Sequence, residues 1–533
     1  MKNLRLTIAL CLVTYSSLFS QTLADAIRFT TNEQFESADA AFKKLIAAQP
    51  QNGELYFYYG ENYFENDNLD MANAMYQKGV EVNATNPLCY IGIGKILWNQ
   101  GVAKETEAKT NFYKATSLAN KKDIVVPLKI AEVYISFESK DLDDAFKLLE
   151  QAEKIDNKNP QVYILKGDAY LEAGENGGYA INNYEKAEAL DKNSVIAILR
   201  EGKLYSRAKN YPLALDFYKK ANSIDSSFAP AYREKAEIYF RAGQYNNAVE
   251  QFKRYLQLNN NCSARGRYAG FLNQAAKYKE SIDEAKEALK CDSTNAYIYR
   301  YKGRSEYEAG DYINGLVSMN KFFELAAKEP KLKIIPEDYE YRAKLNSKNG
   351  GDSLAVLDYK RALELEPERL EINRDIANTY IKLKKYDKSI EAFKSNLASG
   401  KTNANDYLGM GRAYYYLKDY ANADSAFLKI IQSHPQLPLG YLWRARANAQ
   451  LDPKNEKWQA KTYYESYLTN TKLEEIDKNK KDVVEAYTYM GVYYMNQKDF
   501  CTAKTYFNKI TTLDASNTNA SKFLESKESK NCN

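Results

Sequence analysis

Residues 53–86, GELYFYYGENYFENDNLDMANAMYQKGVEVNATN, decide the fold of this chain. They place Gly60 and Ala72 twelve residues apart, and Tyr76 follows the alanine by four positions. Small residues at facing points let two antiparallel helices approach closely, and a large residue four positions later fills the space toward the next unit. The stretch therefore predicts a pair of closely packed antiparallel helices.

The same pattern recurs along nearly all of the chain's 533 residues, a length beyond that of a single hydrophobic core. In fourteen aligned copies, position eight holds only Gly or Ala, and position twenty is equally small (Ala, Ser or Gly). Position twenty-four is aromatic except for Leu149, Ala285 and Met319. The copies start near residues 19, 53, 87, 124, 160, 195, 229, 262, 296, 336, 370, 404, 438 and 484.

These residues resemble the tetratricopeptide repeat (TPR), a helix–turn–helix unit of 34 residues, and the resemblance spans almost the entire mature chain. It implies an all-α fold, a TPR-type α-solenoid in which the helix pairs form a right-handed superhelix. We place repeats one to nine in residues 21–328, a proline-containing break in 329–336, repeats ten to fourteen in 337–515, and a polar C-terminal capping helix and tail in 516–533.

Two segments interrupt the regular spacing. Residues 329–336 contain Pro330 and Pro336, and proline resists helix continuation. This break either bends the superhelix and separates two blocks of repeats, or it is a longer loop with unchanged stacking. Residues 470–483 form a charged extension before the last repeat.

The N-terminus has the features of a secretory signal peptide, which we place at residues 1–20. Lys2 and Arg5 form a basic region, and a short apolar run follows from Leu6 to Val13. Cleavage after Ser20 or after Ala24 fits this pattern. An uncleaved anchor is the alternative, although the run has about half the roughly 20 apolar residues that a membrane span needs. We expect a secreted bacterial protein located in the periplasm, with any membrane association peripheral and through partners.

The composition argues against several classes of function. The formal net charge of +5 is small and dispersed, which argues against a nucleic-acid partner. His434 is the only histidine, and no Cys-x-x-Cys occurs, so a Cys/His zinc site lacks ligands. No P-loop, Rossmann glycine fingerprint or Gly-x-Ser-x-Gly is present. We expect no catalytic residues, no metal, no cofactor and no enzymatic activity.

The repeat register also predicts disulfides among the five cysteines that remain once Cys11 leaves with the signal peptide. Cys262 and Cys291 lie at the start and end of repeat eight, where antiparallel helices bring those ends together. Cys501 begins the second helix of repeat fourteen, and Cys532 follows the capping helix. We predict both bridges and leave Cys89 as a free thiol. The alternative is that some of these cysteines are buried thiols.

In the family that this chain resembles, ligands commonly lie along the concave groove, against positions two, five, nine, twelve and thirteen of the first helix. Repeats two to five are more apolar at these positions, and Phe57 and Trp98 are among them. Repeats nine to thirteen are basic there, and guanidinium groups bind carboxylates bidentately. The predicted basic groove comprises Arg300, Arg304, Lys344, Arg374, Asn378, Arg412 and Arg446, with Tyr415 nearby.

This groove suggests a protein or peptide partner that carries an acidic segment or a free C-terminal carboxylate. The alternative is that Glu and Asp of neighbouring helices neutralise the basic residues. In the carboxylate-clamp variety of TPR, Arg374 and Asn378 match the first members of the ligand-binding set, but Gly409 occupies the next position that the clamp needs.

Three functions stay open at this stage. The first is a protein-binding adaptor or scaffold of the cell envelope that holds its partner in the concave groove. The second is a purely structural subunit of an envelope or outer-membrane assembly that uses its convex face. The third is a glycan-associated protein, suggested by the groove aromatics Trp98, Trp443 and Tyr415. The oligomeric state is not predicted.

Overall fold

The structure is a computed structural model that describes residues 22–174, 177–259, 262–398, 400 and 403–532. The side chain of Cys262 is not among the parts described, and the predicted signal peptide also lies outside them. Within the described residues the secondary structure is entirely helical, with thirty α-helices and two short 3-10 helices, η1 (Val102–Lys104) and η2 (Leu473–Glu475). The predicted all-α solenoid is confirmed.

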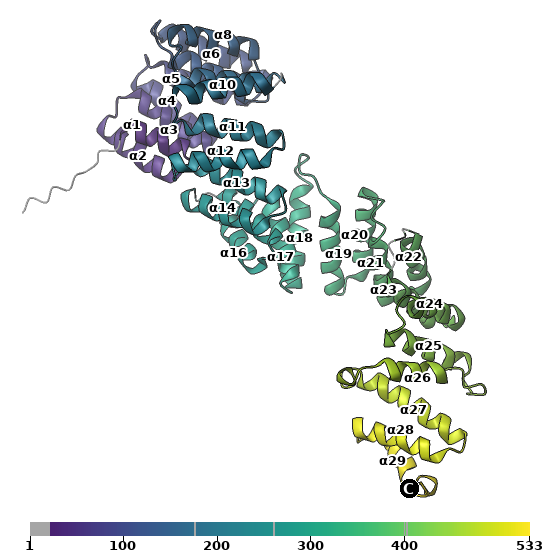
Figure 1. Ribbon diagram of the computed structural model, residues 1–533. Helices are drawn as coiled ribbons and strands as arrows, with labels where there is room; N and C mark the ends of the chain where they lie inside the picture. Colours follow the sequence, from purple (N-terminus) through teal and green to yellow (C-terminus); the bar gives the residue numbers. More distant parts are fainter. Residues whose placement is uncertain (1–21, 175–176, 260–261, 399, 401–402, 533) are drawn as a thin grey trace, which may run out of the picture. The chain divides into compact units, whose positions relative to one another are not determined.

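Twenty-eight of the α-helices form the fourteen predicted pairs, and the two helices of each pair pack side by side (Figure 1). The first helices of the pairs are α1 (Leu23–Thr31), α3 (Gly53–Glu65), α5 (Pro87–Asn99), α7 (Val125–Ser136), α9 (Pro160–Glu172), α11 (Val195–Arg207), α13 (Ala229–Arg241), α15 (Cys262–Gln274), α17 (Ala296–Glu308), α19 (Pro336–Lys348), α21 (Ile372–Lys382), α23 (Ala404–Tyr416), α25 (Pro438–Leu451) and α27 (Lys480–Asn496). The second helices are α2 (Phe35–Ala48), α4 (Leu69–Val82), α6 (Glu105–Leu118), α8 (Leu142–Ile155), α10 (Gly177–Leu190), α12 (Tyr211–Ile224), α14 (Tyr245–Leu258), α16 (Tyr278–Leu289), α18 (Tyr312–Ala326), α20 (Asp352–Leu365), α22 (Tyr386–Ala398), α24 (Tyr420–Ser433), α26 (Lys461–Asn470) and α28 (Phe500–Leu513).

The small residue at position eight of each pair is fixed by close packing. At Gly60, an added Cβ would lie 2.3 Å from Cε1 of Tyr76, the aromatic residue at position twenty-four. At Gly411, it would lie 2.4 Å from the ring of Phe427 in the same relation. The ring therefore packs directly against the glycine, and the two helices lie close together. A larger side chain at the glycine position would force the helices apart.

The helices divide into two compact units, which are described separately here. The first ends at Ser293 and contains α1 to α16, and the second begins at Thr294 and contains α17 to α30. Within the second unit, residues 327–335 connect α18 to α19, and the buried Leu332 packs with Phe322 and Leu345 of those two helices. The proposed separation of repeats at the proline-containing break stays a prediction.

The predicted charged extension at 470–483 is partly helical. Lys480, Lys481 and Asp482 form the first turn of α27, which begins four residues before the predicted start of the last repeat. Asp482 and Glu485 of this helix both bind Arg446 of α25. The extension thus contributes to the packing between the last two repeats.

The C-terminal cap consists of two short helices, α29 (Thr518–Leu524) and α30 (Lys527–Lys530), where the sequence predicted one. The first ends at Leu524 with Glu525 as its C-cap. Ser526 caps the second, since its hydroxyl accepts a hydrogen bond from the backbone N–H of Ser529 at 3.2 Å. Phe523 covers the last repeat by packing on Phe507, with ring centroids 4.6 Å apart.

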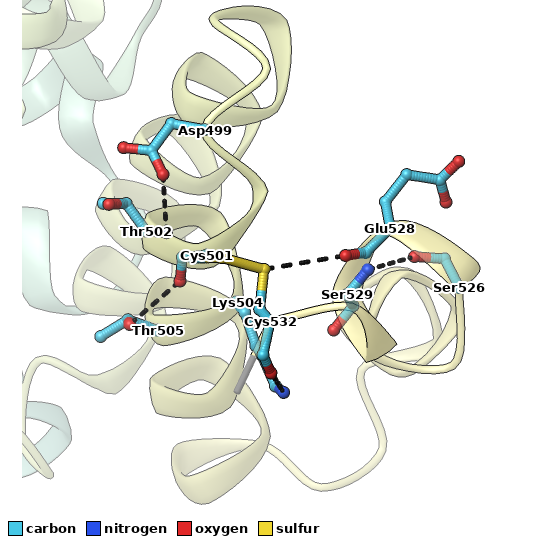
Figure 2. The surroundings of a disulfide bond; sticks show 9 residues. All are labelled: Asp499, Cys501, Thr502, Lys504, Thr505, Ser526, Glu528, Ser529 and Cys532. Carbon is cyan, nitrogen blue, oxygen red and sulfur yellow. Dashed lines mark hydrogen bonds between the residues drawn. A yellow bond between two sulfur atoms is a disulfide. The ribbon is translucent and has the colours of Figure 1, made fainter.

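A disulfide between Cys501 and Cys532 ties this cap to α28, as Figure 2 shows. The Cα atoms lie 5.2 Å apart, and Lys504 Nζ donates a hydrogen bond of 2.7 Å to the carbonyl oxygen of Cys532. This predicted bridge is confirmed, as is the free, buried thiol of Cys89. Cys291 is disulfide-bonded, but its predicted partner Cys262 has a side chain outside the described parts, so that pairing stays a prediction.

Candidate functional site

A cavity of about 510 Å³ lies within the first unit, lined mainly by the first helices of repeats one, two, four, five and six. This volume falls within the range of about 300–1,000 Å³ that is usual for ligand pockets. Its walls alternate apolar and charged side chains. The apolar lining comprises Ile27, Phe35, Tyr58, Ile124, Val125, Leu128, Ile164, Leu165 and Ile196, and the charged lining comprises Glu33, Glu61, Glu65, Lys129, Glu132, Asp168 and Arg200.

Most of the cavity's carboxylates are matched by a cation from a neighbouring helix. Glu61 binds Nζ of Lys95 at 3.1 Å and accepts a hydrogen bond of 2.6 Å from the Tyr76 hydroxyl. Lys95 is itself nearly buried, with 8% of its surface exposed, and its Nζ lies 3.9 Å from the ring centroid of Phe64. This pair therefore belongs to the wall of the cavity.

Two further ion pairs lie in the lining of the cavity. Lys129 Nζ lies 2.8 Å from the Glu132 carboxylate within α7. Burial opposes the ionisation of Glu132, but Lys129 and Lys95 outweigh it and lower its pKa. Arg200 Nε donates to both oxygens of Asp168, at 2.9 and 3.0 Å, and thus joins α11 to α9.

Glu65 differs from the other carboxylates of the lining. Among the described residues, its only ion-pair contact is Lys95 Nζ at 3.6 Å, and no hydrogen bond reaches it. Its side chain lines the cavity and is 56% exposed. Desolvation raises the pKa of Glu65, and the positive charge of Lys95 offsets this in part. Glu65 also ends α3, whose C-terminal carbonyl groups favour a positive charge.

The first unit is closed by contacts between repeats one and seven. The turn between α1 and α2 carries Glu33, whose carboxylate accepts hydrogen bonds from Arg233 Nη1 at 2.5 Å and from the Tyr255 hydroxyl at 2.8 Å. Beside it, the buried Asn32 donates to Asp225 at 2.8 Å. Figure 1 shows the purple α1 and α2 beside the teal α13 and α14. The repeats therefore complete a ring, and the cavity lies inside it.

In the second unit, the basic residues predicted at the groove are largely bound by carboxylates of the next repeat. Arg300 and Arg304 both donate to the fully buried Asp338, at 2.8 and 2.6 Å. Arg374 binds the fully buried Asp406 through Nε and through Nη2, the latter at 3.0 Å. These guanidinium groups hold consecutive repeats together. For these residues the structure agrees with the alternative given above, in which Glu and Asp of neighbouring helices neutralise the basic side chains.

Arg446 is also bound internally, because its Nη2 lies 2.7 Å from Asp482 and 2.6 Å from Glu485. Arg412 is different. Its guanidinium lies 5.5 Å from the ring centroid of Trp443, and its buried Nε has no hydrogen-bond partner among the described residues. Tyr415 packs edge-on against the same Trp443 ring at 5.5 Å.

The other predicted groove residues fall into two groups. Lys344 is half-buried, 5.3 Å from the Tyr341 ring, and Asn378 is exposed. Phe57 and Trp98 are core residues, 1% and 2% exposed, and the Trp98 indole donates a hydrogen bond of 2.8 Å to the Ser139 carbonyl. The prediction of a ligand-binding role for Phe57 and Trp98 is wrong, because adjacent helices cover both side chains.

Gly409, at the third position of the carboxylate clamp, is also explained by packing. A Cβ there would lie 2.2 Å from Cζ of Phe393, so no asparagine fits. With Arg374 bound to Asp406 as well, the clamp is absent from the described part of this unit.

Sequence reasoning missed the acidic side of the first unit's cavity. Glu61, Glu132 and Asp168 occupy position nine of their repeats, and Glu65 occupies position thirteen. These are the positions at which the basic groove was predicted further along the chain. Applying the same register to repeats two, four and five would have found these carboxylates.

Two kinds of feature are absent from the described residues. No helix there is long and apolar enough to cross a membrane. No group of three or more His, Cys, Asp and Glu side chains is arranged there to hold a metal ion.

Comparisons with known proteins agree with the repeat pattern. Models of the tetratricopeptide repeat match residues 229–262, 375–395 and 407–436. The chain is 23% identical over 178 residues to heat shock protein STI1 of Saccharomyces cerevisiae, which corresponds to 33% of this chain and 29% of that protein. The chain thus spans less than a third of the length of this curated relative.

Two solved structures are also similar. A protective antigen from uropathogenic Escherichia coli with an SLR fold is 16% identical, over 80% of this chain and 95% of that one, with a TM-score of 0.45. The C-terminal part of a TPR repeat-containing protein from Cytophaga hutchinsonii is 30% identical, over 49% of this chain and 100% of that one, with a TM-score of 0.45. The repeat models match within the helix pairs described above, and they identify the family: the chain belongs to the tetratricopeptide-repeat proteins.

Proposed function

We propose that this protein is a binding adaptor of the bacterial cell envelope that holds a peptide segment of a partner in the cavity of its first unit. Tetratricopeptide folds generally bind protein or peptide partners, and they are typically scaffolds without catalysis. The observation that carries the proposal is the cavity of about 510 Å³ with apolar walls and one carboxylate, Glu65, that lacks a hydrogen bond from the described residues.

The basic groove of the second unit is a weaker candidate for the same role. Arg304 and Arg374 already satisfy buried carboxylates, so an acidic ligand would have to compete with Asp338 and Asp406 for them. Charge reversal at Arg304 would place a second carboxylate beside Asp338 and would disturb folding. It therefore does not test recognition.

A crosslinking pull-down from native envelope tests the proposal. Ser136 lines the cavity and is exposed, so Ser136→Trp fills the space while leaving the helix packing intact. Ser117→Trp is the matched control, at an exposed position of the second helix α6. We expect the wild type and Ser117→Trp to capture the same partner and Ser136→Trp to lose it. Equal capture by all three would overturn the cavity as the binding site.

A structural role through the outer helices is the second candidate, and exposed apolar side chains in the second unit favour it. Ile313 and Val317 of α18 are 72% and 64% exposed, and Leu354 and Leu357 of α20 are 56% and 60% exposed. Isolated apolar residues are common on protein surfaces, but four on two adjacent outer helices are typical of a contact surface. Capture that persists in Ser136→Trp and is lost in Val317→Glu/Leu357→Glu would favour this role.

The envelope location is part of the proposal and rests on the basic and apolar pattern of residues 1–20. We expect the protein in the periplasmic fraction, with a mature N-terminus at Gln21 or Asp25. Fractionation followed by N-terminal sequencing checks both. Recovery of the intact N-terminus in the cytoplasmic fraction would contradict the location.

A further inference from the structure

We propose that the first unit's cavity recognises a peptide segment in which a lysine or arginine lies beside apolar side chains, with Glu65 as the group that binds the cation. This inference rests on the proposed function and specifies its ligand. The sequence suggested an acidic partner for the basic groove, whereas this cavity favours a basic one.

The charge balance of the cavity supports a cationic group. Five carboxylates and two cations line it. Lys95 and Arg233 lie outside the lining and reach Glu61 and Glu33 at 3.1 and 2.5 Å. With the Lys129 and Arg200 pairs, four carboxylates each have a cation, and the fifth, Glu65, only shares Lys95 with Glu61, at the longer distance of 3.6 Å. One positive charge from a ligand therefore completes the balance.

The position of Glu65 favours a side-chain cation. Glu65 is the last residue of α3, the end at which the helix dipole is negative. An ammonium or guanidinium group there is attracted by both the Glu65 carboxylate and the helix dipole.

The rest of the lining favours a peptide over a free metal ion or a small amine. Ile27, Val125 and Ile196 present apolar surface from α1, α7 and α11. A cation alone would leave this surface in contact with water, whereas a segment with neighbouring apolar side chains buries it. A basic side chain flanked by apolar residues matches both parts of the cavity.

Panning a phage-displayed random heptapeptide library on the full mature chain tests the inference. We expect the wild type to enrich peptides that combine Lys or Arg with apolar residues. In Glu65→Gln, we expect the apolar preference to persist and the basic preference to vanish. A synthetic peptide from the wild-type selection should bind Glu65→Gln about tenfold more weakly, the loss of one charge-assisted hydrogen bond. Glu81→Gln, on the outer helix α4 and 64% exposed, is the matched control and should bind as the wild type does.

The outcomes separate this inference from the proposed function. Enrichment of acidic peptides, or an unchanged basic preference in Glu65→Gln, overturns the inference while leaving a peptide-binding cavity. Enrichment that Ser136→Trp does not reduce overturns the cavity as the peptide site and the inference with it. Equal competition by free spermidine and by the selected peptide also overturns the inference, because it assigns the cavity to a small amine.

Discussion

Glu201 places a carboxyl group in the core of α11, where it is 2% exposed. Burial, together with the negative charge of Glu188, raises its pKa from 4.5 to about 8, and Lys220 offsets this only in part. Lys220 instead binds Glu188, with its Nζ 2.6 Å from that carboxylate. The native protein therefore holds Glu201 protonated at pH values at which the unfolded chain has ionised it.

The sign of the pH dependence follows from this difference in pKa. Between about pH 4.5 and pH 8 the native state binds more protons than the unfolded state, so stability falls as pH rises, by up to about 1.4 kcal/mol per unit. Below this window the contribution of Glu201 is fully present. Glu201→Gln removes the dependence, so we expect the variant to gain thermal stability over the wild type as pH rises from 5 to 8. Melting temperatures at each pH measure this.

The exposed Glu81→Gln is the control for the Glu201 experiment, and its melting temperature should follow the wild type at every pH. A difference between Glu201→Gln and wild type that stays constant from pH 5 to pH 8 would contradict the raised pKa of the Glu201 carboxyl.

At the scale of the helices, the disulfide between Cys501 and Cys532 holds two helices that are too short to be stable alone. The α29 and α30 helices have seven and four residues, and isolated helices below about 12 residues are marginal in water. The bridge spans 31 residues of sequence, and closing a loop of that size contributes roughly 3.7 kcal/mol in the chain-entropy model. Reduction, or Cys532→Ser, should therefore loosen the cap.

Hydrogen exchange measured by mass spectrometry checks this prediction. We expect faster exchange in residues 518–532 after reduction or in Cys532→Ser, and no change around Cys89, whose thiol is free in the native protein. Cys89→Ser provides the control for loss of a cysteine outside the cap. Equal protection of the cap in reduced and oxidised protein would show that the packing of Phe523 on Phe507 suffices to hold it.

The helix pairs could be predicted from sequence because the small and large residues that fit against each other lie within the same pair. Gly60 and Tyr76 must be complementary for one pair to form, and a small residue facing a ring in the same way returns in most repeats. The pairing of groove cations was harder to predict, because the partner of Arg304 lies 34 residues away in the next repeat. That separation is one repeat, so an alignment of acidic residues between consecutive copies would have revealed Asp338.

At the scale of the first unit, the ring depends on contacts that no local pattern reports. Glu33 and Arg233 lie 200 residues apart in the sequence. They meet only because the small rotations between successive repeats, from the first to the seventh, add up to bring the two side chains together. The resulting ring explains why the cavity has walls on several sides, and why position-nine carboxylates from different repeats face a shared space. The binding site is therefore a property of the repeats acting together.

Opening this ring is the corresponding prediction. Arg233→Ala removes the ion pair to Glu33 and leaves that carboxylate with the Tyr255 hydroxyl as its remaining partner. Burial opposes the charge on Arg233, but Glu33 outweighs it and raises the pKa of the guanidinium, so the interaction is favourable in the folded state. We expect α1 and α2 to exchange hydrogen several-fold faster in the variant, since breaking a partly buried pair costs about 1–3 kcal/mol.

Arg241→Ala, an exposed arginine at the end of the same helix α13, is the control and should leave exchange in α1 and α2 unchanged. A selected basic peptide should also bind Arg233→Ala more weakly although Arg233 lies outside the cavity lining, because an open ring no longer holds the wall from α1 against that from α11. If exchange rises while peptide affinity is unchanged, the ring stabilises the first repeat but does not shape the cavity. If neither changes, the contacts of Asn32 with Asp225 and Ser227 suffice to keep the ring closed.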